Sequence, residues 1–579
     1  MKSIYLFGIA FLCAISTLAQ QKPAVKWGDD FKLRKGSSEI SVITTDKSGV
    51  YLMELHSSVK EFYVVTARMG RSGTLIKVRP DLTKAFDHDY DKELKNKEFE
   101  LIKPLGDHLF IFATANNKQN KTLELYAAKL DKNNGNLAGD WKLITSFDMQ
   151  DKWSSPTYRI AYNADSTKMV MVQRLGTTGE TQYMVQQIDD QLNVSGGVTL
   201  SNEFGPGTYR LSDVVYTLNH KIVMVGGIYD IVEGKKAKDK NYVFNHYNVR
   251  VYNESGQQES EVNTSLDGKF QNSTKVLQEN NKNLVLAAFY SNIKNSGKVD
   301  GLMVQRIDIN DGKTISTNDR EIKESLLTKD ENVKADDEDD EDDSKEEKES
   351  KKDKSAGTDV DAFKMSKNMH FRNIFPTTDG GLIILAETFS SHTNTSTYYS
   401  PGVNNSPGTE RTTTVTIYES GDIMLCKVAA TGEISWIQTL PKKQREKLVQ
   451  HYGYSVTSGW GPGMSFFSTS EMPYHSGFGA VKSGQNINIF MNDNPKNATV
   501  TKAGQQVRTA SAITKSDCFM ISVDEKTGAL TRNQIFSNKD IPTAMPKSMV
   551  TIGNDVYMVG RSDKNVWKNR IAVGRITLK

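Results

Sequence analysis

The sequence predicts an all-β protein: a single β-propeller of eight four-stranded antiparallel blades. Two observations support this prediction. One supersecondary unit recurs eight times along the 579 residues, and the last copy lacks a strand that the start of the chain can supply. Four-stranded units repeated around an axis are the blades of a propeller, which leaves only short, protected sheet edges. Seven blades are the alternative if the first copy is irregular.

Each copy contains an apolar strand that runs into a turn, often one with glycine. In residues 421–438 the run Ile423–Val428 reaches Thr431-Gly432, and a second apolar run returns with Trp436. Short runs of β-forming residues around a glycine turn are typical of a β-hairpin. The apolar residue that ends this strand is, copy by copy, Val78, Leu130, Ile188, Val251, Ile307, Val428, Val523 and Ile576.

A second apolar strand precedes the hairpin in every copy. These strands are residues 62–67, 109–115, 169–175, 222–229, 284–290, 382–389, 487–491 and 556–560. The eighth copy stops three residues after Ile576 and therefore lacks its fourth strand. Near the N-terminus the run Val25–Leu33 has apolar residues on alternate positions and belongs to no copy. We expect residues 25–33 to pair beside residues 570–577 and to close the ring.

Two of the hairpins, at residues 424–436 and 519–530, resemble the blades of pyrroloquinoline-quinone-type β-propellers. Those blades run from an apolar strand through Asp-x-x-Thr-Gly into a strand that often carries Trp. The resemblance covers the repeat pattern over most of the chain, and it implies the propeller fold. The calcium ligands and vicinal cysteine pair of the quinone-dependent dehydrogenases have no counterpart that can be placed here, so it does not imply that enzyme. We predict no cofactor.

The N-terminus has the features of a secretory signal peptide. One lysine precedes a short apolar segment, Ile4–Leu18, and the small residue Ala19 comes before Gln20. The segment is shorter than the ~20 residues that a membrane-spanning helix needs. We therefore predict that residues 1–19 are a signal peptide. The mature chain is then periplasmic, cell-surface or secreted, with no transmembrane segment.

One strongly acidic segment interrupts the predicted ring. From Asp330 to Glu349 the sequence has thirteen acidic residues and three lysines, a net charge of −10. Since the whole chain carries +3, the rest carries about +13. Such a run buries no apolar surface and is expected to be disordered. The predicted organisation is residues 20–329 as the closing strand and blades 1–5, residues 330–356 as the disordered acidic insertion, and residues 357–579 as blades 6–8.

The sequence contains no pattern that assigns a catalytic residue or a metal ligand. Its nine histidines have no His-x-x-x-His spacing, and no Gly-x-Ser-x-Gly is present. Cys426 and Cys518 stand where other copies have core aliphatic residues. We expect both to be buried free cysteines rather than a disulfide, because buried Cys behaves as a small hydrophobe.

The long insertions all fall in two kinds of loop. These are the loop between the second and third strands of a blade and the loop to the next blade, which open on the same side of a propeller. We call this side the insertion face, and the side with the short turns the hairpin face. Lys443–Gln450, within one insertion, is predicted as a short helix. The insertions are Glu233–Asn241, Asp330–Lys354, Ser390–Thr414, Lys442–Ser470 and Asp493–Thr514.

Aromatic residues gather in these insertions. They form either a stacking platform for a sugar, peptide or partner protein, or the small core of a large loop. Variable loops on a rigid scaffold are where binding residues concentrate. The predicted binding residues are Tyr398, Tyr399, Tyr454, Trp460, Tyr474 and His475.

The leading functional hypothesis is an exported, monomeric, non-catalytic propeller. It binds a partner protein or a polysaccharide, and no nucleic acid, through the insertion face. A propeller enzyme (a hydrolase or oxidoreductase with a site in the central channel) and a structural component of the cell envelope are the alternatives, since the fold does not choose among them. Carboxylates or histidines with shifted pKa values at the channel mouth would favour an enzyme. An exposed aromatic patch would favour binding.

Overall fold

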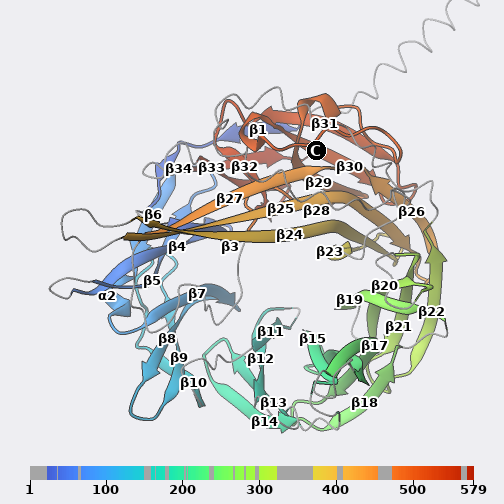
Figure 1. Cartoon of the computed structure of the whole chain (residues 1–579), viewed down its shortest axis with the longest axis horizontal. Coiled ribbons are helices and arrows are strands. Elements are labelled where there is room, and N and C mark those ends of the chain that lie inside the picture. Colours follow the sequence, from blue (N-terminus) through green and yellow to red (C-terminus); the bar gives the residue numbers. More distant parts are fainter. Residues whose placement is uncertain are drawn as a thin grey trace, which may run out of the picture.

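The computed structural model describes most of the chain between residues 23 and 578. The described residues are 23–34, 37–62, 67–148, 158–163, 165–175, 182–200, 204, 207–233, 240–264, 268–279, 282–293, 299–322, 369–400, 409–453, 472–562 and 570–578. Their strands form eight antiparallel sheets that follow one another around a ring (Figure 1). The prediction of an eight-bladed propeller is confirmed.

The strands of each blade are consecutive in sequence, apart from the closing blade. Blade 1 has β3 (Ser37–Asp46), β4 (Gly49–Phe62), β5 (Ala67–Val78) and β6 (Lys84–Asp89); blade 2 has β7 (Glu98–Leu105), β8 (His108–Asn117), β9 (Thr122–Leu130) and β10 (Lys142–Asp148). Blade 3 has β11 (Tyr158–Tyr162), β12 (Lys168–Leu175), β13 (Gln182–Asp189) and β14 (Val194–Leu200); blade 4 has β15 (Tyr209–Tyr216), β16 (Ile222–Glu233), β17 (Lys240–Tyr252) and β18 (Gln258–Asn263).

The second half of the ring repeats this order. Blade 5 has β19 (Phe270–Gln278), β20 (Asn283–Ser291), β21 (Gly301–Asp308) and β22 (Thr314–Glu321); blade 6 has β23 (Met369–Pro376), β24 (Leu382–Ser400), β25 (Thr409–Val428) and β26 (Ile434–Leu440), with β27 (Gln444–Gly453) added to β25. Blade 7 has β28 (Gly479–Ser483), β29 (Asn486–Asp493), β30 (Asp517–Asp524) and β31 (Leu530–Ser537), and blade 8 has β32 (Thr543–Ile552), β33 (Asp555–Ser562) and β34 (Arg570–Thr577). The described helices are the short α2 (Asp91–Leu94), η4 (Pro495–Asn497) and η5 (Ile513–Lys515).

The N-terminal strand closes the ring by completing blade 8. β1 (Ala24–Trp27) pairs antiparallel with β34, from Ala24 opposite Thr577 to Trp27 opposite Gly574, and β2 (Phe31–Lys32) pairs with the start of the same strand. The Trp27 indole lies over glycine, because a Cβ on Gly574 would come within 2.9 Å of it. The predicted closure is therefore confirmed, because the first and last described strands, β1 and β34, lie in one sheet.

The core lies between neighbouring blades. The second and third strands of a blade are buried on both faces, so β20 is buried from Leu284 to Ser291, as a continuous apolar run predicts. Outer strands such as β18 are mostly exposed. Cys426 and Cys518 are buried and free, as predicted. Burial raises the pKa of the Cys426 thiol to about 12, so neither cysteine is a reactive thiolate in this fold.

A polar side chain joins neighbouring blades at four of the eight junctions. It occupies the position just before the apolar residue that ends the third strand, and it donates a hydrogen bond to a backbone carbonyl in the third-to-fourth-strand turn of the next blade. The pairs are Lys77 Nζ to Lys132 (2.9 Å), Gln187 Nε2 to Glu254 (3.1 Å), Arg306 Nη1 to Ala430 (2.8 Å) and Arg575 Nη1 to Pro80 (3.3 Å).

Two local predictions are wrong. The second strand of blade 1 is β4, not residues 62–67: the buried run that includes Val50 and Leu52 pairs with β5, and an apolar pattern alone did not distinguish the two runs. Lys443–Gln450 is not a helix, because β27 pairs with ten residues of β25. A long hydrogen-bonded ladder outweighs helix propensities of a few tenths of a kcal/mol per residue. No helix in the described part of the chain is long and apolar enough to cross a membrane.

Candidate functional site

The blade topology places the described long hairpins on the insertion face. Within each blade the strands alternate in direction, so every second-to-third-strand loop opens on the same side as the connection to the next blade. In three blades the second and third strands run well past the end of the first strand, so their hairpin projects from the blade. These hairpins are β4–β5 in blade 1, β16–β17 in blade 4 and β24–β25 in blade 6. The hairpin face has the short turns.

The blade 6 hairpin is the longest, and with β27 it forms a three-stranded extension that we call the arm. The arm consists of residues 389–400 of β24, 409–420 of β25 and 444–453 of β27, paired in continuous antiparallel register. Twelve residues at ~3.3 Å each give a length of roughly 40 Å. Figure 1 shows the arm running across the ring from blade 6 toward the side of blade 1. Leu448 of the arm packs against the hydrophobic cluster shared by blades 8 and 1.

A buried polar network holds the base of the arm. The ammonium of Lys442 donates to the Glu387 carboxylate, to Ser420 Oγ at 2.5 Å and to Gln444 Oε1 at 3.0 Å. Arg372 Nε donates to Glu387 Oε2 at 2.8 Å. The side chains of Lys442 and Glu387 are 0% and 1% exposed. Burial opposes ionisation of Glu387, but Lys442 and Arg372 outweigh it and hold its pKa below the ordinary value. A serine hydroxyl hydrogen-bonded to a lysine can act as a nucleophile with its general base. Here both side chains are buried, so a substrate cannot reach them.

A second contact fixes the arm to the chain that enters blade 7. The Glu446 carboxylate accepts hydrogen bonds from three successive backbone N–H groups, those of Tyr474, His475 and Ser476, at 2.9, 2.9 and 2.7 Å. Gln444 also donates to the carbonyl of Asn492. Charge-assisted bonds of this kind are about twice as strong as neutral ones. The arm is therefore a fixed feature of the insertion face.

The structure separates the predicted binding residues. Tyr398 and Tyr399 lie in β24 toward the far end of the arm, in register with Arg411 and Glu410. Tyr474 and His475 lie at its base. Tyr454 and Trp460 lie outside the described residues. That these six residues contact a partner stays a prediction.

The two residues at the base have packing partners of their own. Tyr474 is 7% exposed and belongs to the cluster of blades 8 and 1, and the guanidinium of Arg561 lies 4.6 Å from its ring centroid. His475 is partly buried, with Nδ1 3.1 Å from the carbonyl oxygen of Ala544. Tyr474 therefore contributes to the core of the fold.

Blade 4 carries an aromatic and cationic platform that was not predicted from the sequence. The guanidinium of Arg210 lies 4.4 Å from the ring centroid of Tyr229 and 5.7 Å from that of Tyr242, within cation–π range. Beside them Ile231 and Val232 are 45% and 47% exposed. The available signal was the aromatic residues Tyr229 and Tyr242 on the two flanks of the lysine-rich insertion 233–241.

Blade 1 gathers titratable groups at its insertion-face end. Ligand atoms of His56, Asp89 and Asp91 lie within 4.8 Å of one another, and burial raises the pKa of the nearby Glu54. However, Arg34 Nε lies 3.2 Å from Asp89 Oδ2, where it supplies the positive charge that a cation would bring. We assign no metal to this group.

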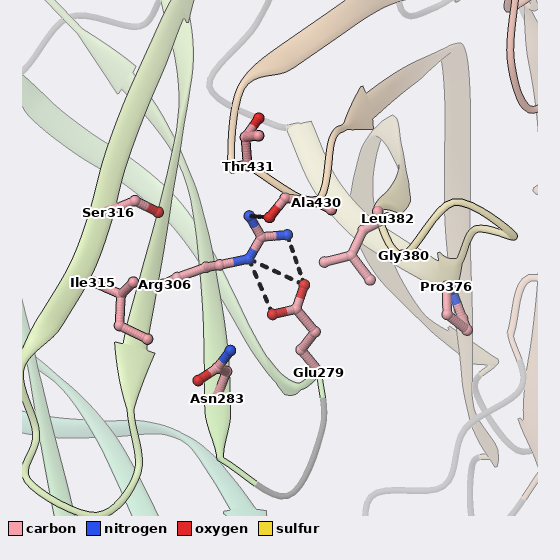
Figure 2. Close-up of a pocket in the computed structure, with 11 residues that line it drawn as sticks. Glu279, Asn283, Arg306, Ile315, Ser316, Pro376, Gly380, Leu382, Ala430 and Thr431 are labelled. Atoms are coloured by element: carbon pink, nitrogen blue, oxygen red, sulfur yellow. Dashed lines mark hydrogen bonds and ion pairs between the residues drawn. The ribbon is translucent and has the colours of Figure 1, made fainter.

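The hairpin face has a pocket of about 520 Å³ between blades 5 and 6. Figure 2 shows Arg306 pointing into it, between the Glu279 carboxylate and the backbone of Ala430. Arg306 Nη2 and Glu279 Oε1 are 2.7 Å apart, and Nη1 donates to Ala430 at 2.8 Å. The positive charge of Arg306 is neutralised by Glu279. The main role of Arg306 is therefore to join blades 5 and 6.

No protein-family model and no curated protein matches this sequence. Among solved structures, the β-propeller domain of the Trilobed protease from Pyrococcus furiosus aligns with 90% of this chain and 98% of its own, at 10% identity and a TM-score of 0.31. An apocarotenoid oxygenase mutant from Synechocystis aligns with 97% and 94%, at 8% identity and 0.29. Prolyl oligopeptidase B from Galerina marginata aligns with 62% of this chain, at 13% identity and 0.28, and the chain spans only 37% of that enzyme. Similarities of this size carry no functional argument.

Proposed function

We propose that this protein is an exported, non-catalytic β-propeller that binds a partner protein or polymer through its insertion face. The observation that carries this proposal is the arm, a roughly 40 Å sheet extension held over the ring by a buried network. The ring closes through β1 and β34, and among the described arm side chains Leu448 is the one that packs against a hydrophobic cluster of the blades. Ordering a long hairpin also costs conformational entropy. A contribution to the stability of the fold therefore does not explain why the protein has the arm.

Two surfaces on this face have the chemistry of recognition. Residues 391–397 of the arm are exposed and carry hydroxyl, amide and imidazole groups. The platform of Arg210, Tyr229 and Tyr242 offers aromatic and guanidinium faces, the groups enriched at binding hot spots. The resemblance of two hairpins to quinone-type blades concerns the fold, and this proposal needs no cofactor.

A propeller enzyme is the second candidate, and the titratable group at the end of blade 1 favours it. Burial raises the pKa of Glu54. Glu54 and the neighbouring His56 are therefore candidates for general acid–base catalysis at the insertion face. A panel of hydrolase and oxidoreductase substrates, assayed with the wild type and with Glu54→Gln, tests this alternative. Turnover that Glu54→Gln abolishes would replace the binding proposal.

The binding proposal is tested by capture with matched variants. The chain from Gln20 is immobilised and incubated with cell-envelope extract. Three forms are compared: the wild type, Arg210→Ala/Tyr242→Ala and Asp311→Ala/Lys313→Ala. The last pair is an exposed ion pair on the hairpin face, with side chains 46% and 81% exposed. We expect a component that the wild type and the Asp311/Lys313 variant retain and the Arg210/Tyr242 variant loses, confirmed with purified proteins. Loss on the Asp311/Lys313 variant instead would place recognition on the hairpin face. Retention of nothing by the wild type would favour a structural role.

A further inference from the structure

The arm has one edge that pairs with no other strand in the described part of the chain. From Leu382 to Thr388, β24 lies between β23 and β25. From Phe389 to Ser400 it pairs with β25 alone. No strand in the described part of the chain lies beside these residues in line with β23, and we call this position the β24 slot. Every second residue of a strand presents its N–H and C=O to such an edge.

The two edges of the arm differ in chemistry. Residues 388–400 contain no Asp, Glu, Lys, Arg or Pro, and 391–397 are all exposed. The opposite edge, β27, carries Arg445 and Lys447, both exposed. Charged side chains and proline are the usual protection of edge strands against pairing with another chain. The arm is therefore protected on one edge and open on the other.

The open edge is already in the geometry that an added strand needs. Thr393 and Thr416 lie 3.0 Å apart through their Oγ1 atoms, and Thr395 and Thr414 lie 3.3 Å apart, so hydroxyl pairs tie β24 to β25. The network around Lys442 fixes the base. Ordering the site at the moment of binding thus costs little conformational entropy.

The position of the β24 edge in the ring bears on which kind of partner can pair with it. In the view of Figure 1, β24 is the arm strand that lies toward the middle of the ring, while β27 lies toward blades 7 and 8. The contact of Leu448 with the cluster of blades 8 and 1 agrees with this. A strand added to this edge would lie on the side of β24 toward the middle of the ring. A second copy would have to bring its own ring against the insertion face to present its arm.

We propose that the β24 slot binds an extended, uncharged polypeptide segment of a partner protein as one additional strand. This inference rests on the proposed function and names the partner chemistry for it. Backbone hydrogen bonds supply the affinity of such strand addition, and alternate side chains supply the specificity. Threonine and serine on β24 favour a segment rich in hydroxyl and β-branched residues, which pair well across strands.

The probe is a phage-displayed library of random peptides of about 12 residues, enough to span the slot at ~3.3 Å per residue. Peptides selected on the purified chain from Gln20 are measured against Thr393→Lys/Thr395→Lys and against Thr414→Lys/Thr416→Lys. The second variant loses the same hydroxyl pairs and gains the same charge, but on the central strand. We expect affinity to fall at least about tenfold for the β24 variant and to stay within about twofold for the β25 variant.

Hydrogen exchange with the bound peptide gives the second readout, and amides within 389–400 should gain protection. Selected peptides that bind both variants equally, or that protect other segments, would overturn the slot. So would protection, in the free monomer, of those amides of 389–400 that face away from β25, because the chain then fills the slot itself. A dimer that the β24 lysines dissociate would assign the slot to a second copy instead. The proposed function survives each of these results if the Arg210→Ala/Tyr242→Ala variant still loses its captured component.

Discussion

At the scale of single residues, the position of the arm depends on buried polar groups that the sequence does not mark. Lys442, Glu387 and Ser420 come from three separate stretches, and only the folded chain brings them together. A buried ion pair adds little net stability when it is intact, but removing one partner leaves a buried charge without compensation. The base of the arm is therefore sensitive to one substitution.

Lys442→Met should lower the free energy of unfolding by about 3–5 kcal/mol, because Glu387 would keep only Arg372 as a cationic partner. Lys447→Met, at an exposed position of β27 five residues further on, should change it by less than about 0.5 kcal/mol. Urea denaturation measures both. Equal stabilities for the two variants would show that the network does not anchor the arm.

The same carboxylate predicts a dependence on pH. Because the pKa of Glu387 lies below its ordinary 4.5 in the folded chain, the unfolded chain binds more protons between the two values. The stability from this group is then complete above pH 4.5 and is lost as the pH falls through the lowered pKa. Urea midpoints between pH 7 and pH 3 should fall less steeply for Glu387→Gln than for the wild type. Parallel curves would contradict this assignment.

At the scale of elements, the strands that repeat in every blade could be predicted from the sequence, whereas β27, which has no counterpart in the other blades, could not. Seven of the eight predicted second strands lie within the observed ones, because burial on both sides demands an unbroken apolar run. The arm had no such signal. β27 contains Arg445, Glu446 and Lys447 in succession, a helix-compatible sequence, and it becomes a strand only because Thr-rich β25 offers it a partner.

Glu446→Gln tests how β27 is fixed to blade 7. The amide oxygen still accepts hydrogen bonds but lacks the charge that strengthens three of them. We expect faster hydrogen exchange at residues 474–476 and a loss of about 1–3 kcal/mol in local stability. Glu419→Gln, an exposed carboxylate in the same arm, serves as the control. Unchanged exchange at 474–476 would mean that the charge of Glu446 does not hold β27 against the chain that enters blade 7.

At the scale of the whole molecule, ring closure was predictable and the candidate site only in outline. A chain that ends without a fourth strand and begins with a spare one leaves few other arrangements. The choice of the insertion face followed from the strand order. Individual site residues did not follow, since the contact of Arg210 with Tyr229 and Tyr242 joins different strands of a blade, and the burial of Tyr474 depends on blades 8 and 1.

Trp27→Ala should destabilise the entire ring by about 2–3 kcal/mol, since a half-buried indole leaves its place over Gly574. Lys26→Ala, an exposed neighbour in the same strand, should have little effect. Both are measured by thermal unfolding followed at several wavelengths. A Trp27→Ala protein that melts at the wild-type temperature would show that β1 does not secure the closure.

Hydrogen exchange of the whole protein, with and without the component it captures, tests the central claim that recognition occurs on the insertion face. We expect added protection within residues 389–400 of the arm and within the β16–β17 hairpin. The hairpin-face turns at 308–313 and 524–529 should exchange at the same rates in both states. Protection confined to those turns would contradict recognition on the insertion face.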